Sequence, residues 1–260
     1  MSDIKGPEWT FNTVSSEFDR WRPAYIPRLY DDIFAAGELS PASKVLEIGI
    51  GTGQATRPFL ETGCSLTAVE LGDNLARYSR DKFAAYKNLN IVNMAFQDFE
   101  CSPESYDLVY SGSAFHWIEE EAGYKKVFQI LKKDGVFARF ANHPYYDKGR
   151  EDITEAIQKL YNRYMPESSP SNEYGEEQAR KRAEIGRKYG FTDISYRIYH
   201  RTRTFTAGEY TSLLGTYSDH IAMEPVKRSR FFREIEDVID QLGGSITLYD
   251  TIDLQLARKP

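Results

Sequence analysis

The stretch Lys44-Val-Leu-Glu-Ile-Gly-Ile-Gly-Thr-Gly-Gln54 decides the fold of this chain. Val45 to Ile48 is apolar apart from one acid, which predicts a short buried strand, and the three alternate glycines after it predict a tight turn. Glycine adopts positive φ and has no Cβ, so the backbone of such a turn can press against a ligand. A helix expected from Gln54 to Glu61 points its free N–H groups at the same place. The stretch therefore predicts a strand, a ligand-binding turn and a helix.

The spacing of the turn narrows the choice of ligand. It reads Glu47-x-Gly49-x-Gly51-x-Gly53, with Gln54 where the dinucleotide fingerprint G-x-G-x-x-G has its third glycine. The P-loop pattern G-x-x-x-x-G-K-[ST] does not occur. An acid before the first glycine suits an amino-acid ammonium or holds the loop, which favours S-adenosylmethionine over a nicotinamide cofactor. A glycine turn without any ligand stays open as an alternative.

The composition is that of an ordinary folded protein. The length of 260 residues suffices for one large α/β domain, and the net charge of -6 argues against a nucleic-acid partner. Two cysteines without a C-x-x-C pair predict a reduced, cytoplasmic chain with no metal site. The N-terminus has no apolar leader-like run, and no run of about 18 uncharged apolar residues occurs. We therefore expect neither a signal peptide nor a membrane partner.

The hydrophobic pattern divides the chain into four segments. Residues 1–40 are expected to form a helical lid, because apolar residues recur there at three- and four-residue steps. Residues 41–142 alternate apolar runs with amphipathic stretches, which is typical of an α/β fold with a doubly wound, mostly parallel sheet that forms the cofactor-binding core. The elements expected in this core are strands at 45–48, 65–71, 89–94, 106–111 and 136–140 and helices at 54–61, 73–86 and 119–131.

The second half of the chain adds a cap and the last strands. Residues 143–189 follow the fifth strand where a short crossover suffices, so their helical pattern predicts a cap-like insertion with a loop at Pro166–Asn172. Residues 190–260 are expected to complete the sheet, with strands at 191–206 and 245–257 and helices at 207–214 and 228–242. The whole chain, 1–260, is predicted to be a single domain.

A second acid follows the glycine turn at the spacing of an adenosine site. Glu70 ends the second strand, near the distance from Gly49 at which an acid meets ribose hydroxyls. Its alternative role, favouring the next helix through the helix dipole, is weaker because Asp73 is expected to cap that helix. The residues expected to flank the adenine are Leu71, Leu75, Phe96 and Gln97.

Several motifs together carry a family resemblance. They are Val45–Gly53, Glu70, Ala95–Phe99, Tyr106–Ser111 leading to Ala114–Trp117, and Leu131–Gly135. In this order they resemble the motifs of class I S-adenosylmethionine-dependent methyltransferases. They are most similar to the small-molecule branch that includes trans-aconitate methyltransferase-like proteins. Arg22-Pro23 and Tyr210–Ser218 resemble the terminal segments of that branch, so the resemblance covers most of the chain.

The chain departs from the family pattern at three places. Lys133-Asp134-Gly135 stands where a glycine pair is common, and Gln97-Asp98 stands where an acid near the adenine amino group is common. Ser111-Gly-Ser-Ala114 replaces the Asn/Asp-Pro-Pro-Tyr/Phe tetrapeptide of enzymes that methylate amino groups of nucleic-acid bases or glutamine. The last departure argues against those substrates.

The resemblance implies a seven-stranded Rossmann-like sheet and methyl transfer to a small molecule, at a carboxylate or hydroxyl oxygen. It makes His116 the candidate base for a hydroxyl acceptor, with packing beside Trp117 as the alternative. The cofactor-binding residues that it implies are Arg22, Tyr25, Glu47, Gly49, Gly51, Gly53, Glu70, Leu71, Leu75, Phe96, Gln97 and Ser111. A non-catalytic binder of the same cofactor and a nicotinamide-dependent oxidoreductase stay open as other functions. The oligomeric state is not predicted.

Overall fold

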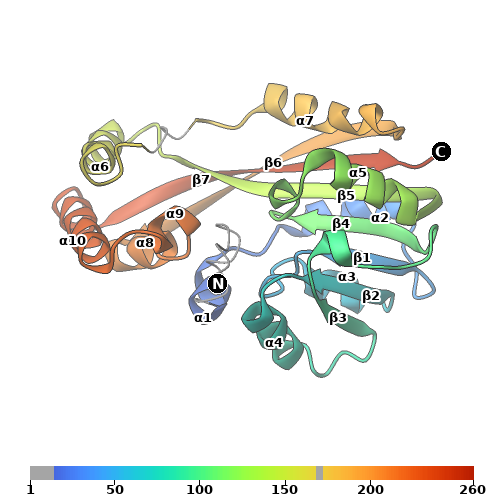
Figure 1. Ribbon diagram of the computed structural model, residues 1–260. Coiled ribbons are helices and arrows are strands. Elements are labelled where there is room, and N and C mark those ends of the chain that lie inside the picture. Colours follow the sequence, from blue (N-terminus) through green and yellow to red (C-terminus); the bar gives the residue numbers. More distant parts are fainter. Residues whose placement is uncertain (1–14, 168–171) are drawn as a thin grey trace. The chain divides into compact units, whose positions relative to one another are not determined.

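The computed structural model describes residues 15–167 and 172–260. Residues 1–14 of the predicted lid and 168–171 of the predicted loop lie outside this range. The chain divides into two compact units, each described by itself below (Figure 1). Unit 1 comprises Met1–Arg22, His143–Tyr174 and His200–Thr251; unit 2 comprises Pro23–Asn142, Gly175–Tyr199 and Ile252–Pro260.

The sheet has seven strands in the order β3-β2-β1-β4-β5-β7-β6. The strands are β1 (Lys44–Ile48), β2 (Ser65–Glu70), β3 (Leu89–Asn93), β4 (Tyr106–Gly112), β5 (Leu131–Tyr146), β6 (Thr192–Thr206) and β7 (Ser245–Arg258). The neighbours from β3 to β5 pair in parallel. The predicted seven-stranded, Rossmann-like α/β fold is confirmed.

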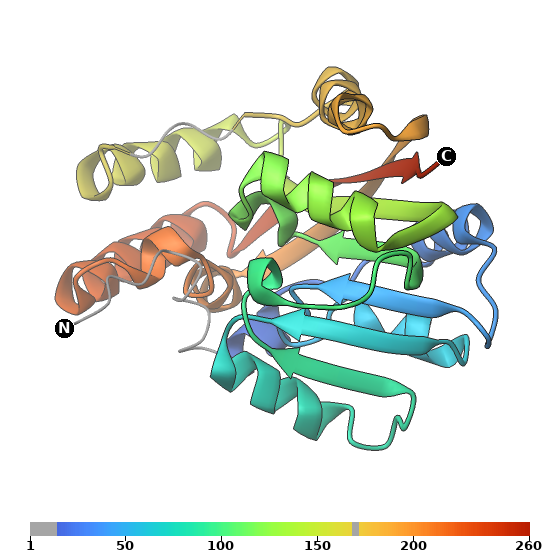
Figure 2. The same cartoon turned by 45° about the vertical axis from the view of Figure 1, so that its right-hand side comes forward.

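Both faces of the sheet in unit 2 are buried, because successive residues of its strands point to opposite sides. The helices of this unit are α2 (Pro27–Gly37), α3 (Thr56–Glu61), α4 (Asp73–Lys82), α5 (Glu120–Ile130) and α7 (Glu176–Lys188). Val45 packs in one cluster with residues of α2 and α3, whereas Leu46 packs in another with residues of α5. Figure 2 shows α2 and α5 on opposite faces of the strands. This arrangement is the doubly wound one that the sequence predicts.

The strand order reverses direction between β1 and β4. From β1 the chain adds β2 and β3 on one side, and β4 and β5 lie on the other. In such sheets ligands bind beyond the carboxyl ends of the strands at the point of reversal. The glycine turn follows β1, so the fold places it at the expected ligand site.

Unit 1 has a helical core of its own. Its helices are α1 (Ser15–Trp21), α6 (Glu151–Tyr164), α8 (Ala207–Leu214), α9 (Ser218–Ile221) and α10 (Pro225–Gln241). Ile153 and Ile157 on α6 pack in one cluster with Phe231 and Ile235 on α10. The four-residue spacing in each helix places these side chains on a single face, so the two helices bury their apolar faces together.

Several boundaries differ from the sequence prediction. The segment predicted as a cap, 143–189, is divided, because α6 lies in unit 1 and α7 in unit 2. The fifth strand, expected at 136–140, begins at Leu131 in β5 and includes a local turn at 133–135, where Asp134 takes a φ of 62° and the Lys259 N–H donates to the Gly135 carbonyl at 2.9 Å. The hydrogen bond from Lys259, the residue after β7, thus keeps this turn within the sheet as a local irregularity of the strand. Gly72, and not Asp73, is the N-cap of α4.

Candidate active site

The glycine turn after β1 has the backbone that only glycine adopts easily. Gly49, Gly51 and Gly53 have φ of 75°, 57° and 83°. A Cβ on Gly49 would lie 2.5 Å from the Cβ of Ala114, in the loop after β4, and a Cβ on Gly53 would lie 2.2 Å from the Phe83 ring. The turn is therefore fixed both by its conformation and by close neighbours on two sides.

Glu70 joins the glycine turn to the end of β2. One carboxylate oxygen accepts from the Gly51 N–H and the other from the Gly72 N–H, both at 2.8 Å. Burial raises the pKa of Glu70, and the bonds from Gly72 and Gly51 oppose that rise. Each carboxylate oxygen has a second lone pair, so these bonds leave acceptor capacity for ribose hydroxyls. The ribose role of Glu70 stays a prediction.

Glu47 is buried beneath the turn and is 1% exposed. Its carboxylate accepts from the Thr56 hydroxyl at 2.8 Å, which ties β1 to the first residue of α3. Burial raises the pKa of Glu47 to about 7, and the Thr56 hydrogen bond opposes that rise. The Thr56 hydrogen bond is a contact of the loop-holding kind, and the ammonium-binding role of Glu47 stays a prediction.

The C-terminal half of α4 and its C-cap hold the glycine turn from a side that the sequence did not reveal. The buried Ser79 hydroxyl donates to the Gly51 carbonyl at 2.7 Å, and the Lys82 ammonium donates to the Thr52 carbonyl at 2.9 Å. Phe83, the C-cap, is the ring that faces Gly53. The available signal was the polar Ser79 on the face of α4 whose other buried residues are apolar.

The residues predicted to flank the adenine lie after β2 and β3, which are paired strands. The Asn93 side-chain amide donates to the carbonyls of Glu70 and Leu71, so the two strand ends are linked directly. Leu75 and Phe96 are buried, Leu71 is half-buried and Gln97 is exposed, with its carbonyl bonded to Lys126. The structure thus brings this group to one edge of the site.

Two more of the predicted residues lie at the end of β4 or contact the loop after it. The buried Ser111 hydroxyl donates to the Ile48 carbonyl at 2.9 Å, so its visible role is to link β4 to β1. The Tyr25 hydroxyl lies 2.8 Å from that of Ser113, and its ring packs edge-on against Phe140. Tyr25 is therefore placed beside the loop after β4.

Arg22 and His116 have surroundings of a different kind. Arg22 lies in unit 1, where its guanidinium donates to the hydroxyl and the carbonyl of Thr216 and stacks 4.0 Å from the Tyr217 ring centroid. His116 is exposed in a 3₁₀ turn at Phe115–Trp117, with its ring centroid 4.8 Å from that of Trp117. Its catalytic role stays a prediction.

Within residues 15–167 and 172–260, no group of His, Cys, Asp or Glu side chains is placed to hold a metal ion. In the same described part of the chain, no helix has the length and apolarity needed to cross a membrane.

Comparison with known proteins points to methyl transfer. A family model described as a methyltransferase domain matches residues 46–138, which include the glycine turn. An uncharacterized methyltransferase of Schizosaccharomyces pombe is 22% identical over 236 residues, covering 88% of this chain and 87% of that protein. Among curated relatives, a Saccharomyces cerevisiae protein described as an S-adenosylmethionine-dependent methyltransferase is 28% identical over 154 residues, 58% of this chain and 52% of that protein.

Solved structures share the fold. A chain assigned as a type II methyltransferase of Anaeromyxobacter dehalogenans superposes with a TM-score of 0.64 at 19% identity and covers 91% of this chain and 97% of that one. At these identities the likeness supports the fold alone.

Proposed function

We propose that this chain, an S-adenosylmethionine-dependent methyltransferase of class I, transfers the methyl group of that cofactor to an oxygen of a small-molecule acceptor. The observation that carries the proposal is the glycine turn, whose three glycines take positive φ and whose middle glycine, Gly51, is held by Glu70 and Ser79. A turn held in place before the ligand arrives loses little entropy on binding.

In this proposal, different residues of unit 2 contact different parts of the cofactor. The amino-acid part of the cofactor packs against the backbone of the glycine turn, and Glu70 accepts hydrogen bonds from the ribose hydroxyls. The half-buried Leu71 and the buried Phe96 contact the adenine. Tyr25, which is already bonded to Ser113, borders the methyl group.

Methyl transfer requires alignment of the acceptor more than it requires a strong base. S-adenosylmethionine, when bound, supplies a methyl group already activated by the sulfonium charge. The chain must therefore hold the acceptor oxygen in line and exclude water. An ionised carboxylate needs no base, whereas a hydroxyl does. The carboxylate is the acceptor implied by the resemblance of the sequence motifs to trans-aconitate methyltransferase-like proteins.

His116→Ala separates these two acceptors. For a carboxylate acceptor we expect kcat to fall by less than ~100-fold with cofactor affinity unchanged, because base catalysis typically contributes ~10²–10⁴-fold where it is needed. A loss beyond ~10³-fold at unchanged affinity would make His116 the base and the acceptor a hydroxyl.

Two measurements test the function itself. Calorimetry should show binding of S-adenosylhomocysteine and none of comparable strength for NAD(H); the reverse result would remove the proposal in favour of an oxidoreductase. A screen of small organic acids, phenols and amines with a tritiated methyl donor should then reveal the acceptor. Tight cofactor binding without turnover on any acceptor would support a non-catalytic binder instead.

A further inference from the structure

Unit 1 contains a cavity whose lining includes none of the predicted cofactor-binding residues. It has a volume of about 210 Å³. Its lining residues are Pro144, Tyr145, Tyr146, Gln158, Tyr161, Tyr210, Leu214, Tyr217, Asp219, His220 and Leu248. An engineered apolar cavity of about 150 Å³ holds benzene, so this cavity has room for one ring with a substituent.

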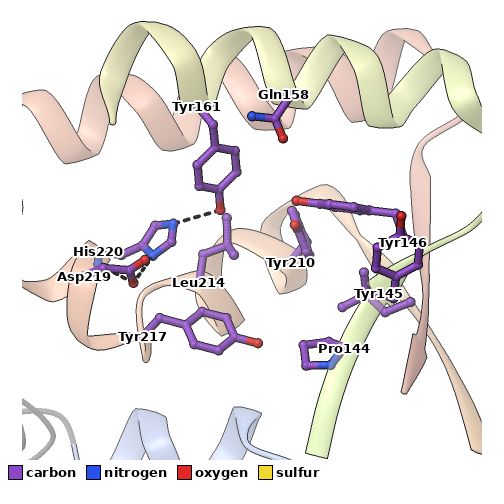
Figure 3. A pocket seen from close by; sticks show the side chains of 11 residues that line it. Pro144, Tyr145, Tyr146, Gln158, Tyr161, Tyr210, Leu214, Tyr217, Asp219 and His220 are labelled. Carbon is purple, nitrogen blue, oxygen red and sulfur yellow. Dashed lines mark hydrogen bonds and ion pairs between the residues drawn. The ribbon is translucent and has the colours of Figure 1, made fainter. Parts of the chain in front are cut away.

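Three side chains at one end of the cavity form a hydrogen-bond relay (Figure 3). The Asp219 carboxylate lies 2.7 Å from His220 Nδ1, and His220 Nε2 lies 2.9 Å from the Tyr161 hydroxyl. A carboxylate on Nδ1 fixes the proton there and leaves Nε2 as an acceptor. The Tyr161 O–H therefore donates to His220, and its oxygen keeps a lone pair to accept a further hydrogen bond.

The relay is held in place by burial of His220, and the group that it presents to the cavity, the Tyr161 hydroxyl, is neutral. His220 is 3% exposed, and the Phe231 ring stacks on it at 6.0 Å. Burial raises the pKa of Tyr161, which keeps its hydroxyl protonated. Burial likewise raises the pKa of Tyr210, another residue of the cavity lining. The hydroxyl groups of Tyr161 and Tyr210 thus act as neutral hydrogen-bonding groups.

The charges of the lining disfavour an ionic ligand. Among the described residues, no lysine or arginine lines the cavity. Arg22 is engaged with Thr216 and stacks on the Tyr217 ring. The one carboxylate in the lining, Asp219, is engaged with His220. A buried charge without a partner is costly, so an anion or a cation would bind poorly.

We propose that this cavity binds a neutral monocyclic phenol or alcohol whose hydroxyl donates to the Tyr161 oxygen. The tyrosine rings contact the apolar body of the ligand, and the relay through His220 to Asp219 polarises its hydroxyl. A hydroxyl held in this way is also one of the two kinds of methyl acceptor, a hydroxyl or a carboxylate oxygen, that the proposed function allows. Binding of this ligand in unit 1 nevertheless does not depend on methyl transfer, and it can be measured without that reaction.

Four ring compounds of similar size test the ligand class on the unmodified chain: phenol, toluene, benzoate and benzylamine. Ligand-observed NMR titration should show phenol binding about tenfold more tightly than toluene, because toluene leaves the Tyr161 oxygen without a donor. Benzoate and benzylamine should bind at least about tenfold more weakly than phenol. Equal binding of phenol and toluene, or preferential binding of either ion, would overturn the proposal.

Tyr161→Phe assigns the site. The variant should bind toluene as the unmodified chain does and lose the phenol preference, a change of ratio that a loss of packing alone does not produce. The matched control is Tyr164→Phe on the same helix, whose hydroxyl bonds Glu234 outside the cavity lining. If Tyr161→Phe does not fold, Asp219→Asn provides the second test, and it should reduce the phenol preference about threefold. A ratio unchanged in the folded variant would place the binding elsewhere.

Discussion

The glycine-turn site of unit 2 and the tyrosine cavity of unit 1 are built by opposite means. The turn is made of backbone groups from one short stretch, fixed by Glu70 and Ser79. The cavity is made of side chains from β5, α6, α8, α9 and β7, spread from Pro144 to Leu248. The difference teaches that a site made of backbone is written into adjacent residues, whereas a site made of side chains depends on how distant elements pack.

Removing a core ring from unit 1 should have the largest effect. Phe231 is fully buried, with ring centroids 5.1 Å from those of both Tyr161 and Tyr164. We expect Phe231→Ala to lower the free energy of unfolding by about 3–5 kcal/mol, measured by urea titration. Val226→Ala, at a position 75% exposed on the same helix, is the control and should change it by less than ~0.5 kcal/mol. If Phe231→Ala weakens cofactor binding as much as phenol binding, the contrast between the two sites fails.

Gly51→Val should break the backbone site. A β-branched residue is strained at a φ of 57°, so the turn must change its conformation. We expect S-adenosylhomocysteine affinity to fall at least ~100-fold by calorimetry. Gly208→Val on α8, where a Cβ would meet no atom within 4 Å, is the control. Affinity within a few-fold of the original would show that the turn does not contact the ligand.

Glu47→Gln should change how the stability of the chain depends on pH, and so tests the electrostatic contribution of the glycine-turn site. Because the pKa of Glu47 is raised to about 7 in the fold, the folded chain holds a proton that the unfolded chain releases between about pH 4.5 and 7. The contribution of this group to stability is present below about pH 4.5 and falls by about 3 kcal/mol as the pH rises through 7. Glu47→Gln keeps an acceptor for Thr56 and should remove that fall. Unfolding titrations of both proteins from pH 5 to 8 decide it, and parallel curves would contradict the assignment.

Glu70→Ala should have the smallest effect of the four. It leaves the Gly51 and Gly72 N–H groups without their acceptor, so we expect cofactor binding to weaken by about 1–3 kcal/mol. Glu70→Gln, which keeps one acceptor oxygen, should lose less than Glu70→Ala. Calorimetry on the two variants measures the difference, and equal binding by Glu70→Ala and the unmodified chain would exclude the ribose role.

The sequence alone determined the fold class and the cofactor edge of the sheet. Strand and helix periods and the turn after Ile48 follow from neighbouring residues, because burial repeats every two residues in a strand and every 3.6 in a helix. The absence of a Cβ in glycine predicted a turn with positive φ, which Gly49, Gly51 and Gly53 adopt.

Only the tertiary structure decided how distant residues meet. Ser79 on α4 supports Gly51, and Asp219, His220 and Tyr161 form one relay, although no motif joins them. The division of residues 143–189 between the two units was likewise hidden, since α6 and α7 have similar amphipathic patterns and differ only in the partner that covers them. Local periodicity says which face of a helix is buried, and only long-range packing says against what.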